Sequence, residues 1–399
     1  MSEPGPFGRR LAQVFNRYQE PGGEETWVKT LEGSVGIPTC YFNSADWTGP
    51  HAPPVWSRAL RLIYNPGSLD KIREFQRREH AEAWIFHNVF PVGSAAIYRE
   101  AERQRIPLIQ YIHNFRPLGL SGYLTPSDLP SLHNRTRIYL REIARGSWQN
   151  SRVKTAWLAM VVVLARLFRW FDSVTAWIAV SDFMRDQFIR AGIPSDRIFT
   201  LRHFWRPTED FGNTSDNGYY LFIGRLIGLK GVLVLLDVWD RILQEQGKAG
   251  PKLVIVGEGP LDEIIKARAA QNTLVDFRGS VSIETKRELL RGTRALIAPS
   301  LCLESLGLVA YEAYDFAKPV LAACAGGLAE IVLHEETGFL HEPGDAIALQ
   351  EQIITLENEP ETRARFGRNG RGWLLENADE QKWREKFREI VDFAIAAKL

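Results

Sequence analysis

The sequence predicts an α/β protein of two doubly wound domains, each built on a parallel β-sheet with helices on both faces. Short apolar runs alternate with helix-forming stretches along almost the whole chain, which is the pattern of parallel sheets. A polar, glycine-containing stretch, residues 206–218, interrupts the alternation and suits a linker. The 399 residues therefore divide into two domains of about 200 residues each, a common domain size.

The first domain is expected to comprise residues 1–205. Its strands are predicted from apolar runs that are short enough for buried strands. These runs are residues 11–15, 36–42, 83–89, 106–112 and 174–180. Helix-forming stretches follow most of them, for example residues 70–80 and 94–104. The residues ahead of Leu11 are interpreted as an additional arm.

The second domain is expected to comprise residues 219–380. Its predicted strands are residues 219–223, 252–256, 275–278, 295–298 and 319–322. The tail, residues 381–399, carries apolar side chains at helical spacing, among them Trp383 and Phe387. A helix with such a stripe needs an apolar partner, so we expect the tail to pack back on the first domain.

The composition is that of an ordinary globular protein, with 45% apolar and 24% charged residues. A net charge of +1 argues against a general nucleic-acid binder. Cys40, Cys302 and Cys324 lack C-x-x-C or metal-ligand spacing, which favours a reducing compartment. The N-terminus lacks a signal-peptide core, and no run approaches the ~20 apolar residues that span a bilayer. We therefore expect a cytoplasmic protein.

Residues 135–172 form a basic segment with interleaved tryptophans and aliphatic residues. Between His133 and Asp172, eight arginines and lysines stand against the single acid Glu142. Such a segment can lie on an anionic membrane, here on its inner face. It can equally be a buried helix whose arginines reach water at the domain edge. The sequence leaves both interpretations open.

Two carboxylates, Glu304 and Glu312, flank the predicted start of a helix. They follow an apolar run that ends at Pro299 and Ser300, and Gly307 precedes the helix-forming stretch. A rise of about 1.5 Å per residue separates the two acids by roughly 12 Å along the axis. Phosphates could bind the N–H groups of the helix start, with sugar hydroxyls at the flanking acids. The alternative is a solvated acidic helix face.

Two cations follow the first strand of the second domain. Gly224 is expected to let the chain turn, and Arg225 and Lys230 then place fixed positive charge near the next helix. A diphosphate leaving group needs such charge as its bond to a sugar breaks. The alternative is a pair of surface cations at a helix start, where the dipole disfavours them. Residues 256–260, Val-Gly-Glu-Gly-Pro, lack a complete dinucleotide fingerprint and are interpreted as a tight turn.

Polar residues also end strands of the first domain. His113 and Asn114 follow one predicted strand, where they could bind or protonate a substrate oxygen. His87 and Asn88 form a similar pair, for which a role in satisfying a loop is the favoured interpretation. Residues 22–25, Gly-Gly-Glu-Glu, suit either a turn or a close approach of backbone to phosphate.

Taken together, these segments resemble the retaining glycosyltransferases of GT-B architecture that use nucleotide-diphospho-sugars, usually called glycosyltransferase family 4. The resemblance covers nearly the whole chain and is strongest from residue 219 to about 352. Its motifs in the second half are residues 224–231 (Gly-Arg-x4-Lys-Gly), 256–260, 277–279 (Phe-Arg-Gly), 298–313 (Ala-Pro-Ser-x3-Glu-Ser-x-Gly-Leu-x3-Glu-Ala), 326–331 and 337–345. Residues 22–25, 87–91 and 112–116 look like family segments in the first half.

The resemblance implies roles for residues of the second domain. Arg225 and Lys230 would hold the donor diphosphate beside Gly224, and Glu304 would contact the transferred sugar. Glu312 would accept both ribose hydroxyls. Backbone N–H groups would bind the phosphates at Ser305, Leu306, Gly307 and Leu308.

The resemblance also implies roles at the nucleotide base and in the first domain. Ser280 and Val281 would flank the base. His113 would lie beside the sugar carbon under attack, and Gly22 and Gly23 would border the diphosphate from the first domain. The implied catalytic residues are His113, Arg225, Lys230 and Glu304. No metal or other cofactor is expected.

The sequence thus predicts a retaining glycosyltransferase, with the first domain on the acceptor side and the second binding the nucleotide-sugar. Bacterial surface glycan or glycolipid assembly is the expected setting. Rivals are a GT-B-type sugar epimerase, a non-catalytic sugar-nucleotide-binding subunit and an NAD- or NADP-linked oxidoreductase. One departure is the absence of a cysteine from residues 115–122, where relatives often carry one, so acceptor details do not transfer.

Overall fold

The computed structural model describes residues 6–18, 22–50, 52–209 and 216–398, and the chain divides into two compact units. Unit 1 comprises Met1–Tyr123, Asp128–His203 and Lys382–Leu399. Unit 2 comprises Leu124–Ser127 and Phe204–Gln381. Residues 210–215 of the expected linker and residues 1–5 of the expected N-terminal arm lie outside the described residues.

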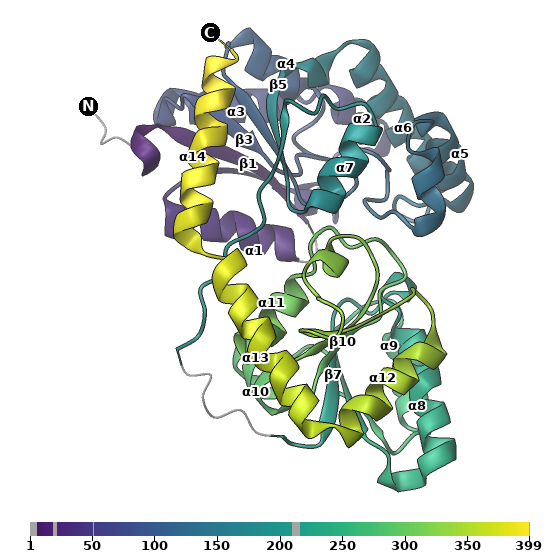
Figure 1. The fold of residues 1–399 in the computed structure, drawn as a ribbon. Helices are drawn as coiled ribbons and strands as arrows, with labels where there is room; N and C mark the ends of the chain where they lie inside the picture. Colours follow the sequence, from purple (N-terminus) through teal and green to yellow (C-terminus); the bar gives the residue numbers. More distant parts are fainter. Residues whose placement is uncertain (1–5, 19–21, 51, 210–215, 399) are drawn as a thin grey trace. The chain divides into compact units, whose positions relative to one another are not determined.

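Unit 1 is built on a parallel sheet, of which β1, β3 and β5 are labelled in Figure 1. The strand order is β2-β1-β3-β4-β5-β6. Its strands are β1 (Leu11–Arg17), β2 (Thr39–Asn43), β3 (Ala83–Phe86), β4 (Leu108–Ile112), β5 (Val174–Ala179) and β6 (Ile198–Thr200). The register places Val14 opposite both Cys40 and Phe86, so β1 lies between β2 and β3. Almost every residue of β3, β4 and β5 is buried, as in a sheet covered on both faces.

Unit 2 repeats this plan with the order β12-β11-β10-β7-β8-β9. Its strands are β7 (Tyr219–Ile223), β8 (Lys252–Val256), β9 (Val275–Phe277), β10 (Leu296–Ala298), β11 (Val320–Ala323) and β12 (Gly338–His341). All the pairings are parallel. The prediction of two doubly wound parallel sheets is therefore confirmed.

Three helices of unit 1 begin at side-chain caps. The side chains of Asn134, Ser151 and Ser181 accept hydrogen bonds from the first turns of α5, α6 and α7. The helices are α1 (Gly23–Thr30), α2 (Val55–Ile63), α3 (Pro66–Glu79), α4 (Ala96–Arg103), α5 (Arg135–Arg145), α6 (Arg152–Leu167) and α7 (Asp182–Arg190). No helix among the described residues has both the length and the apolar content to cross a membrane.

The last helix, α14 (Glu380–Ala396), runs almost entirely within unit 1. Its apolar stripe contacts aromatic rings from distant parts of the chain. Trp383 meets Trp27 edge to face at 5.5 Å between centroids, and Phe393 meets Phe199 at 5.0 Å. Outside the stripe, Arg9 donates to the Asp392 carboxylate at 3.0 Å.

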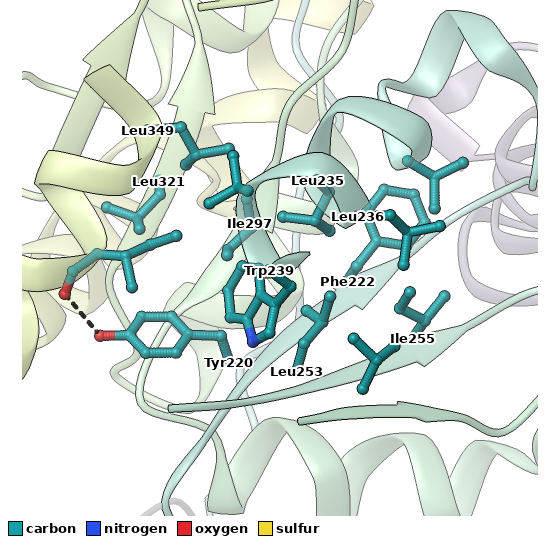
Figure 2. Packing of buried hydrophobic residues seen from close by; sticks show 14 of the residues in the cluster. Tyr220, Phe222, Leu235, Leu236, Trp239, Leu253, Ile255, Ile297, Leu321 and Leu349 are labelled. Atoms are coloured by element: carbon teal, nitrogen blue, oxygen red, sulfur yellow. Dashed lines mark hydrogen bonds between the residues drawn. The ribbon is translucent and has the colours of Figure 1, made fainter. Parts of the chain in front are cut away.

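The helices of unit 2 surround a core in which Trp239 of α8 packs among residues of β7 and β8 (Figure 2). The Tyr220 ring lies 6.0 Å from the Trp239 ring, and its hydroxyl donates to the Ile353 carbonyl at 3.2 Å. The helices are α8 (Val232–Gln246), α9 (Asp262–Ala269), α10 (Ile283–Gly292), α11 (Leu308–Asp315), α12 (Ala346–Asn358) and α13 (Pro360–Asn377).

Each sheet has a point at which the strand order reverses. In unit 1, β1 is followed by β2 on one side and β3 on the other, and in unit 2, β7 has β8 on one side and β10 on the other. Open α/β sheets bind ligands beyond the carboxyl ends of the strands at such points. In unit 2 this position belongs to the segments after β7 and β10, which contain Arg225, Lys230 and Glu304.

Candidate functional site

The segments after β7 and β10 are joined by a salt bridge between Lys230 and Glu304. The Lys230 ammonium lies 2.7 Å and 2.9 Å from the two carboxylate oxygens, and the Ser300 hydroxyl donates to one of them. The side chains are only 25% and 15% exposed. Burial alone would raise the pKa of Glu304, but the Lys230 charge and these hydrogen bonds outweigh it and lower the pKa. The carboxylate is therefore ionised at neutral pH.

The backbone of Glu304 is held by the turn after β11. Its N–H donates to the Ala325 carbonyl at 3.2 Å, and its carbonyl accepts from the Gly327 N–H at 2.8 Å. Gly326 permits this contact because its φ is +65° and a Cβ there would lie 2.4 Å from the Glu304 carbonyl oxygen. The Gly-Gly segment at 326–327 thus fixes the position of the carboxylate.

A close approach of two backbone segments also fixes the segment after β7, but the glycine that this approach requires is not Gly224. Gly224 has no left-handed backbone, and a Cβ there would make ordinary contact with the Phe222 ring at 3.4 Å. The chain bends at Gly224, as the sequence indicated, but this bend does not require a glycine. The position that requires a glycine is Gly257 in the turn after β8, because a Cβ there would lie 1.9 Å from the Gly224 carbonyl oxygen.

The turn after β8 thereby braces the segment that carries Arg225. Leu226 donates to the Glu258 carbonyl at 2.9 Å and accepts from the Leu261 N–H at 3.1 Å. The Arg225 side chain itself is exposed. Residues 256–260 form the tight turn that the sequence indicated, and this turn holds the neighbouring loop.

Helix α11 begins immediately after Gly307, whose φ of +98° is left-handed. No side chain caps this helix start, so its first N–H groups have no side-chain acceptor from within the described chain. The Leu306 side chain is buried, so the polar groups of the segment Ser305–Leu308 are its backbone and the Ser305 hydroxyl. This is the geometry of an anion-binding helix start.

Glu312, on α11, forms an ion pair that the sequence analysis did not anticipate. Lys286 of α10 places its ammonium 2.8 Å from a Glu312 oxygen. Nothing in the spacing of residues 286 and 312 signals the contact, which follows from the packing of two helices. The turn before α10 contains exposed Ser280 and half-buried Val281, and Ser282 caps the helix.

In unit 1, residues 22–25 hold a buried carboxyl group. Gly22 is the N-cap of α1, which begins at Gly23, and Glu24 lies in the first turn. Glu24 accepts hydrogen bonds from the Tyr18 hydroxyl at 2.7 Å, the Asn88 N–H at 2.8 Å and the Asn114 amide at 3.2 Å. Burial raises its pKa, and the hydrogen bonds and Arg116 only partly offset that effect.

His113, the predicted catalytic residue of unit 1, belongs to a cluster with His87 and His203. Gln13 donates its amide N–H groups to Val28, Ile37 and Thr39, so its oxygen accepts from His87 Nε2 at 2.9 Å. His87 Nδ1 is then an acceptor, and His113 Nε2–H donates to it at 2.8 Å. His113 Nδ1 is left buried, without a partner in the described chain.

The histidine cluster is neutral. Burial lowers the pKa of His87 and of His203 to about 3, and burial together with the two neighbouring histidines lowers that of His113. The Nδ1 atom of neutral His113 can therefore accept a hydrogen bond, which fits the expected role of binding a substrate hydroxyl. The other expected role, protonation of a substrate oxygen, stays a prediction. His87, interpreted as a possible loop residue, orients His113.

Comparison with known proteins gives the family. Residues 26–204 match the model described as Glycosyltransferase Family 4, and residues 206–373 match that of the Glycosyl transferases group 1. The D-inositol 3-phosphate glycosyltransferase of Corynebacterium efficiens is 31% identical over 319 residues, 78% of this chain and 71% of that protein. O-antigen chain mannosyltransferase C of Escherichia coli is 33% identical over 175 residues, 43% of this chain and 45% of that protein.

Several other curated relatives are also matched over less than half of their own length. Among solved structures, Anabaena Alr3699/HepE in complex with UDP-glucose superposes with a TM-score of 0.66 at 17% identity, over 96% of this chain and 99% of that one. The likeness in fold therefore extends along nearly the whole chain. Together with the relatives at 30% identity and above, it shows that the chain belongs to the glycosyltransferases of GT-B architecture.

Proposed function

We propose that the protein is a retaining glycosyltransferase that moves a sugar from a nucleoside-diphospho-sugar to an acceptor hydroxyl. The observation that supports this most strongly is the Lys230–Glu304 pair at the strand-order reversal of unit 2. A buried ammonium and carboxylate beside an uncapped helix start form a set of groups that fits a sugar diphosphate.

In this proposal the donor replaces the internal salt bridge with two new interactions. The Lys230 ammonium turns to the diphosphate, together with Arg225 and the N–H groups of Ser305–Leu308. The Glu304 carboxylate is then free to accept hydrogen bonds from hydroxyls of the transferred sugar. Glu312 exchanges Lys286 for the ribose hydroxyls, while Ser280 and Val281 flank the base.

The chemical step breaks the bond between the anomeric carbon and the phosphate oxygen and forms a bond from that carbon to the acceptor oxygen. The acceptor proton passes to the departing phosphate, so no protein base is required. The two cations stabilise the charge that develops on the diphosphate. Because Lys230 and Arg225 supply this charge, we propose that transfer needs no metal, and a chelator should leave the rate unchanged.

His113 would contribute a hydrogen-bond acceptor rather than a proton. Its Nδ1 is the buried atom without a partner in the described chain, and a sugar hydroxyl is the donor that it would fit. Gly22 and Gly23 at the start of α1 would contact the diphosphate through backbone N–H groups. Both roles are part of the proposal and come from the family resemblance.

The nucleotide-sugar donor is supported by the solved structure of HepE with UDP-glucose. The name of the E. coli O-antigen chain mannosyltransferase supports a surface glycan as the acceptor. We place the reaction in the cytoplasm, where a nucleotide-sugar would be available.

The test is incubation with UDP-, GDP- and ADP-sugars and a candidate acceptor, with release of nucleoside diphosphate and the anomeric configuration of the product followed by NMR. The proposal expects stoichiometric diphosphate and a product that keeps the donor configuration. An epimerised donor without acceptor glycosylation would favour a GT-B epimerase instead. Donor binding without either product would favour a non-catalytic subunit.

A further inference from the structure

Helices α2, α5 and α6 gather in one part of unit 1 and expose an unusual amount of apolar surface (Figure 1). Helix α6 packs against both α5 and α2, and Trp157 of α6 donates to the Ala59 carbonyl of α2 at 3.0 Å. The large exposed apolar residues on and beside these helices are Val55, Trp56, Leu60, Tyr64, Leu140, Val153, Met160, Val163, Leu167 and Phe168. We call these three helices, with Tyr64 and Phe168, the α2–α5–α6 face.

The exposed apolar residues of α6 follow helical periodicity. Val153, Met160, Val163 and Leu167 are spaced seven, three and four residues apart, so they form one stripe along the helix. Leu158, Val161 and Ala165 are buried on the side that packs against unit 1. Helix α6 therefore presents an apolar stripe to solvent in addition to the one it buries. Such a second stripe marks an interaction surface.

The same face is positively charged and largely without internal compensation. Among the described residues, none of these basic side chains lies within salt-bridge distance of a carboxylate: Arg135, Arg137, Arg145, Arg152, Lys154 and Arg166. The single acid within the segment, Glu142, is buried and accepts hydrogen bonds from Leu120 and Ser121 instead. Apolar side chains within a field of uncompensated cations match an anionic lipid surface.

A cavity of about 260 Å³ opens between α5 and α6 within this face. It is lined by Arg135, Thr136, Tyr139, Val163, Arg166 and Leu167. Arg135 donates to the Ala191 carbonyl, and Arg166 donates to the Pro117 carbonyl at 2.7 Å. One donor on each guanidinium is thus fixed by the backbone, and others remain for a ligand, because a guanidinium has five N–H groups.

The cavity combines features that suit a phosphate attached to an apolar chain. Two guanidinium groups bind phosphate oxygens in fixed geometry, and Val163 and Leu167 supply an apolar rim. Among the described residues no carboxylate lies within salt-bridge distance of Arg135, and burial lowers its pKa. Tyr139 is a buried wall of the cavity, and its hydroxyl has no partner in the described chain.

We propose that the α2–α5–α6 face docks on an anionic membrane and that the cavity between α5 and α6 binds the phosphate of one lipid headgroup. The exposed apolar residues enter the interfacial region of the bilayer, and the surrounding cations face neighbouring anionic lipids. This inference does not depend on the glycosyltransferase reaction, and it is tested without measuring activity.

The first test measures co-sedimentation with vesicles of phosphatidylcholine, alone or with 30% phosphatidylglycerol, at low and high salt. We expect binding to the anionic vesicles only, and weaker binding at high salt. Arg135→Gln/Arg166→Gln should bind about 25-fold more weakly, at about fivefold for each arginine. The matched control is Arg241→Gln/Arg368→Gln, which removes two exposed cations from unit 2 and should bind as wild type does. Equal binding to both vesicle types would overturn the proposal.

The second test separates the cavity from the general charge of the face. Monomeric dihexanoyl phosphatidylglycerol should raise the melting temperature of wild type and of Arg137→Gln/Arg145→Gln, but not of Arg135→Gln/Arg166→Gln. An equal rise in all three would overturn the assignment of the cavity. If inorganic phosphate alone reproduces the rise, the cavity is a free-anion site, and the lipid assignment is wrong.

A third variant covers the case in which loss of the two arginines prevents folding. Leu167→Ser/Phe168→Ser changes only exposed side chains, so it should fold normally. It should lose at least tenfold in affinity for anionic vesicles, because two apolar anchors are removed. Unchanged vesicle binding by this variant would contradict the docking surface.

Discussion

The candidate sites of the two units are organised by opposite electrostatics. In unit 2, Lys230 and Glu304 are charged and paired at 2.7 Å, and burial is outweighed by their attraction. In unit 1, burial keeps His87, His113 and His203 neutral. A hydrogen bond and ring stacking join His87 to His113, and the His203 ring lies tilted with its centroid 5.3 Å from that of His113. In the proposed reaction, the charged pair of unit 2 would stabilise the charge that develops on the diphosphate, and the neutral cluster of unit 1 would orient a substrate hydroxyl.

The comparison predicts different consequences of mutation in the two units. A paired buried charge is costly to leave alone, so changes in unit 2 should affect both stability and turnover. For a neutral histidine cluster, the free energy of unfolding depends on pH instead. This is because the unfolded chain binds protons at pH values at which the buried histidines stay neutral.

The largest expected effect is that of Lys230→Met. It removes a cation from the diphosphate and leaves the buried Glu304 carboxylate without its partner. We expect kcat/KM to fall about 100- to 1000-fold and the free energy of unfolding to fall by about 3 kcal/mol. Steady-state kinetics and urea unfolding measure the two effects separately.

Two variants serve as controls for that experiment. Lys230→Met/Glu304→Gln should recover most of the stability but none of the activity. Lys286→Met breaks the other lysine–glutamate pair of unit 2 and should cost far less turnover. If Lys286→Met and Lys230→Met lower kcat/KM equally, the special role of the Lys230–Glu304 pair is wrong.

The next effect is a contrast between two glycines. Gly326→Ala places a Cβ 2.4 Å from the Glu304 carbonyl oxygen at a φ of +65°, so it should destabilise the protein by about 3 kcal/mol and reduce turnover. Gly224→Ala meets only ordinary contacts and should change stability by less than about 0.5 kcal/mol. Thermal unfolding of both variants measures the two changes in stability. A loss of stability in Gly224→Ala as large as that in Gly326→Ala would contradict the contacts described for Gly224.

A third effect is the pH dependence of the histidine cluster. The folded-state pKa of His87 and of His203 is about 3, whereas an unfolded histidine titrates near 6.5. Between these values the unfolded chain binds more protons, so stability is lost as the pH falls. Each of these histidines should contribute a loss of about 2 kcal/mol from pH 7 to pH 5. Glu24, whose pKa is raised, acts in the opposite direction.

The test replaces His203, which stacks on Trp27 at 3.9 Å and has no hydrogen-bond partner for either ring nitrogen in the described chain. His203→Phe should reduce the loss of unfolding free energy between pH 7 and pH 5 by about 2 kcal/mol. His133→Gln, a change at an exposed histidine, should leave that loss unchanged. The same pH dependence in wild type and His203→Phe would show that the cluster is not held neutral.

The smallest effect is expected at Glu312. Glu312→Gln weakens acceptance of the ribose hydroxyls and should raise KM for the donor about tenfold or less, with little change in kcat. Lys286→Met should not raise KM, because it removes the group that competes with ribose for Glu312. A fall in kcat for Glu312→Gln at unchanged KM would contradict this role.

The sequence predicts the sheets well where strands are continuous apolar runs. β7 is such a run and has the predicted bounds, whereas β1 and β4, which contain Gln13 and Gln110, each differ from the prediction by two residues at one end. β6 and β12 were not predicted, because they have only three and four residues and two residues of each are half-buried. α2 was not predicted because its apolar residues Val55, Trp56 and Leu60 face solvent, and a pattern analysis assumes that such residues face a core.

The candidate sites likewise contain residues that the sequence predicts and contacts that it does not. The acids and cations of unit 2 were recognisable because they follow strands, and the polar residues that follow parallel strands gather at one edge. The contacts that the site residues of both units make were not recognisable from the sequence. The contacts of Gln13 with His87, and of Lys286 with Glu312, join residues 74 and 26 positions apart and arise only from packing. The glycine requirement at 257 depends on backbone approach that no local pattern reveals.

The measurement that tests the account most directly is calorimetric binding of UDP, GDP and ADP to wild type, Lys230→Met and Glu304→Gln. At least one nucleoside diphosphate should bind wild type. It should bind Lys230→Met at least tenfold more weakly, and Glu304→Gln equally or more tightly, because that change removes the carboxylate that competes for Lys230. Equal affinity for wild type and Lys230→Met, or no binding to wild type, would contradict the claim that this pair forms the diphosphate site.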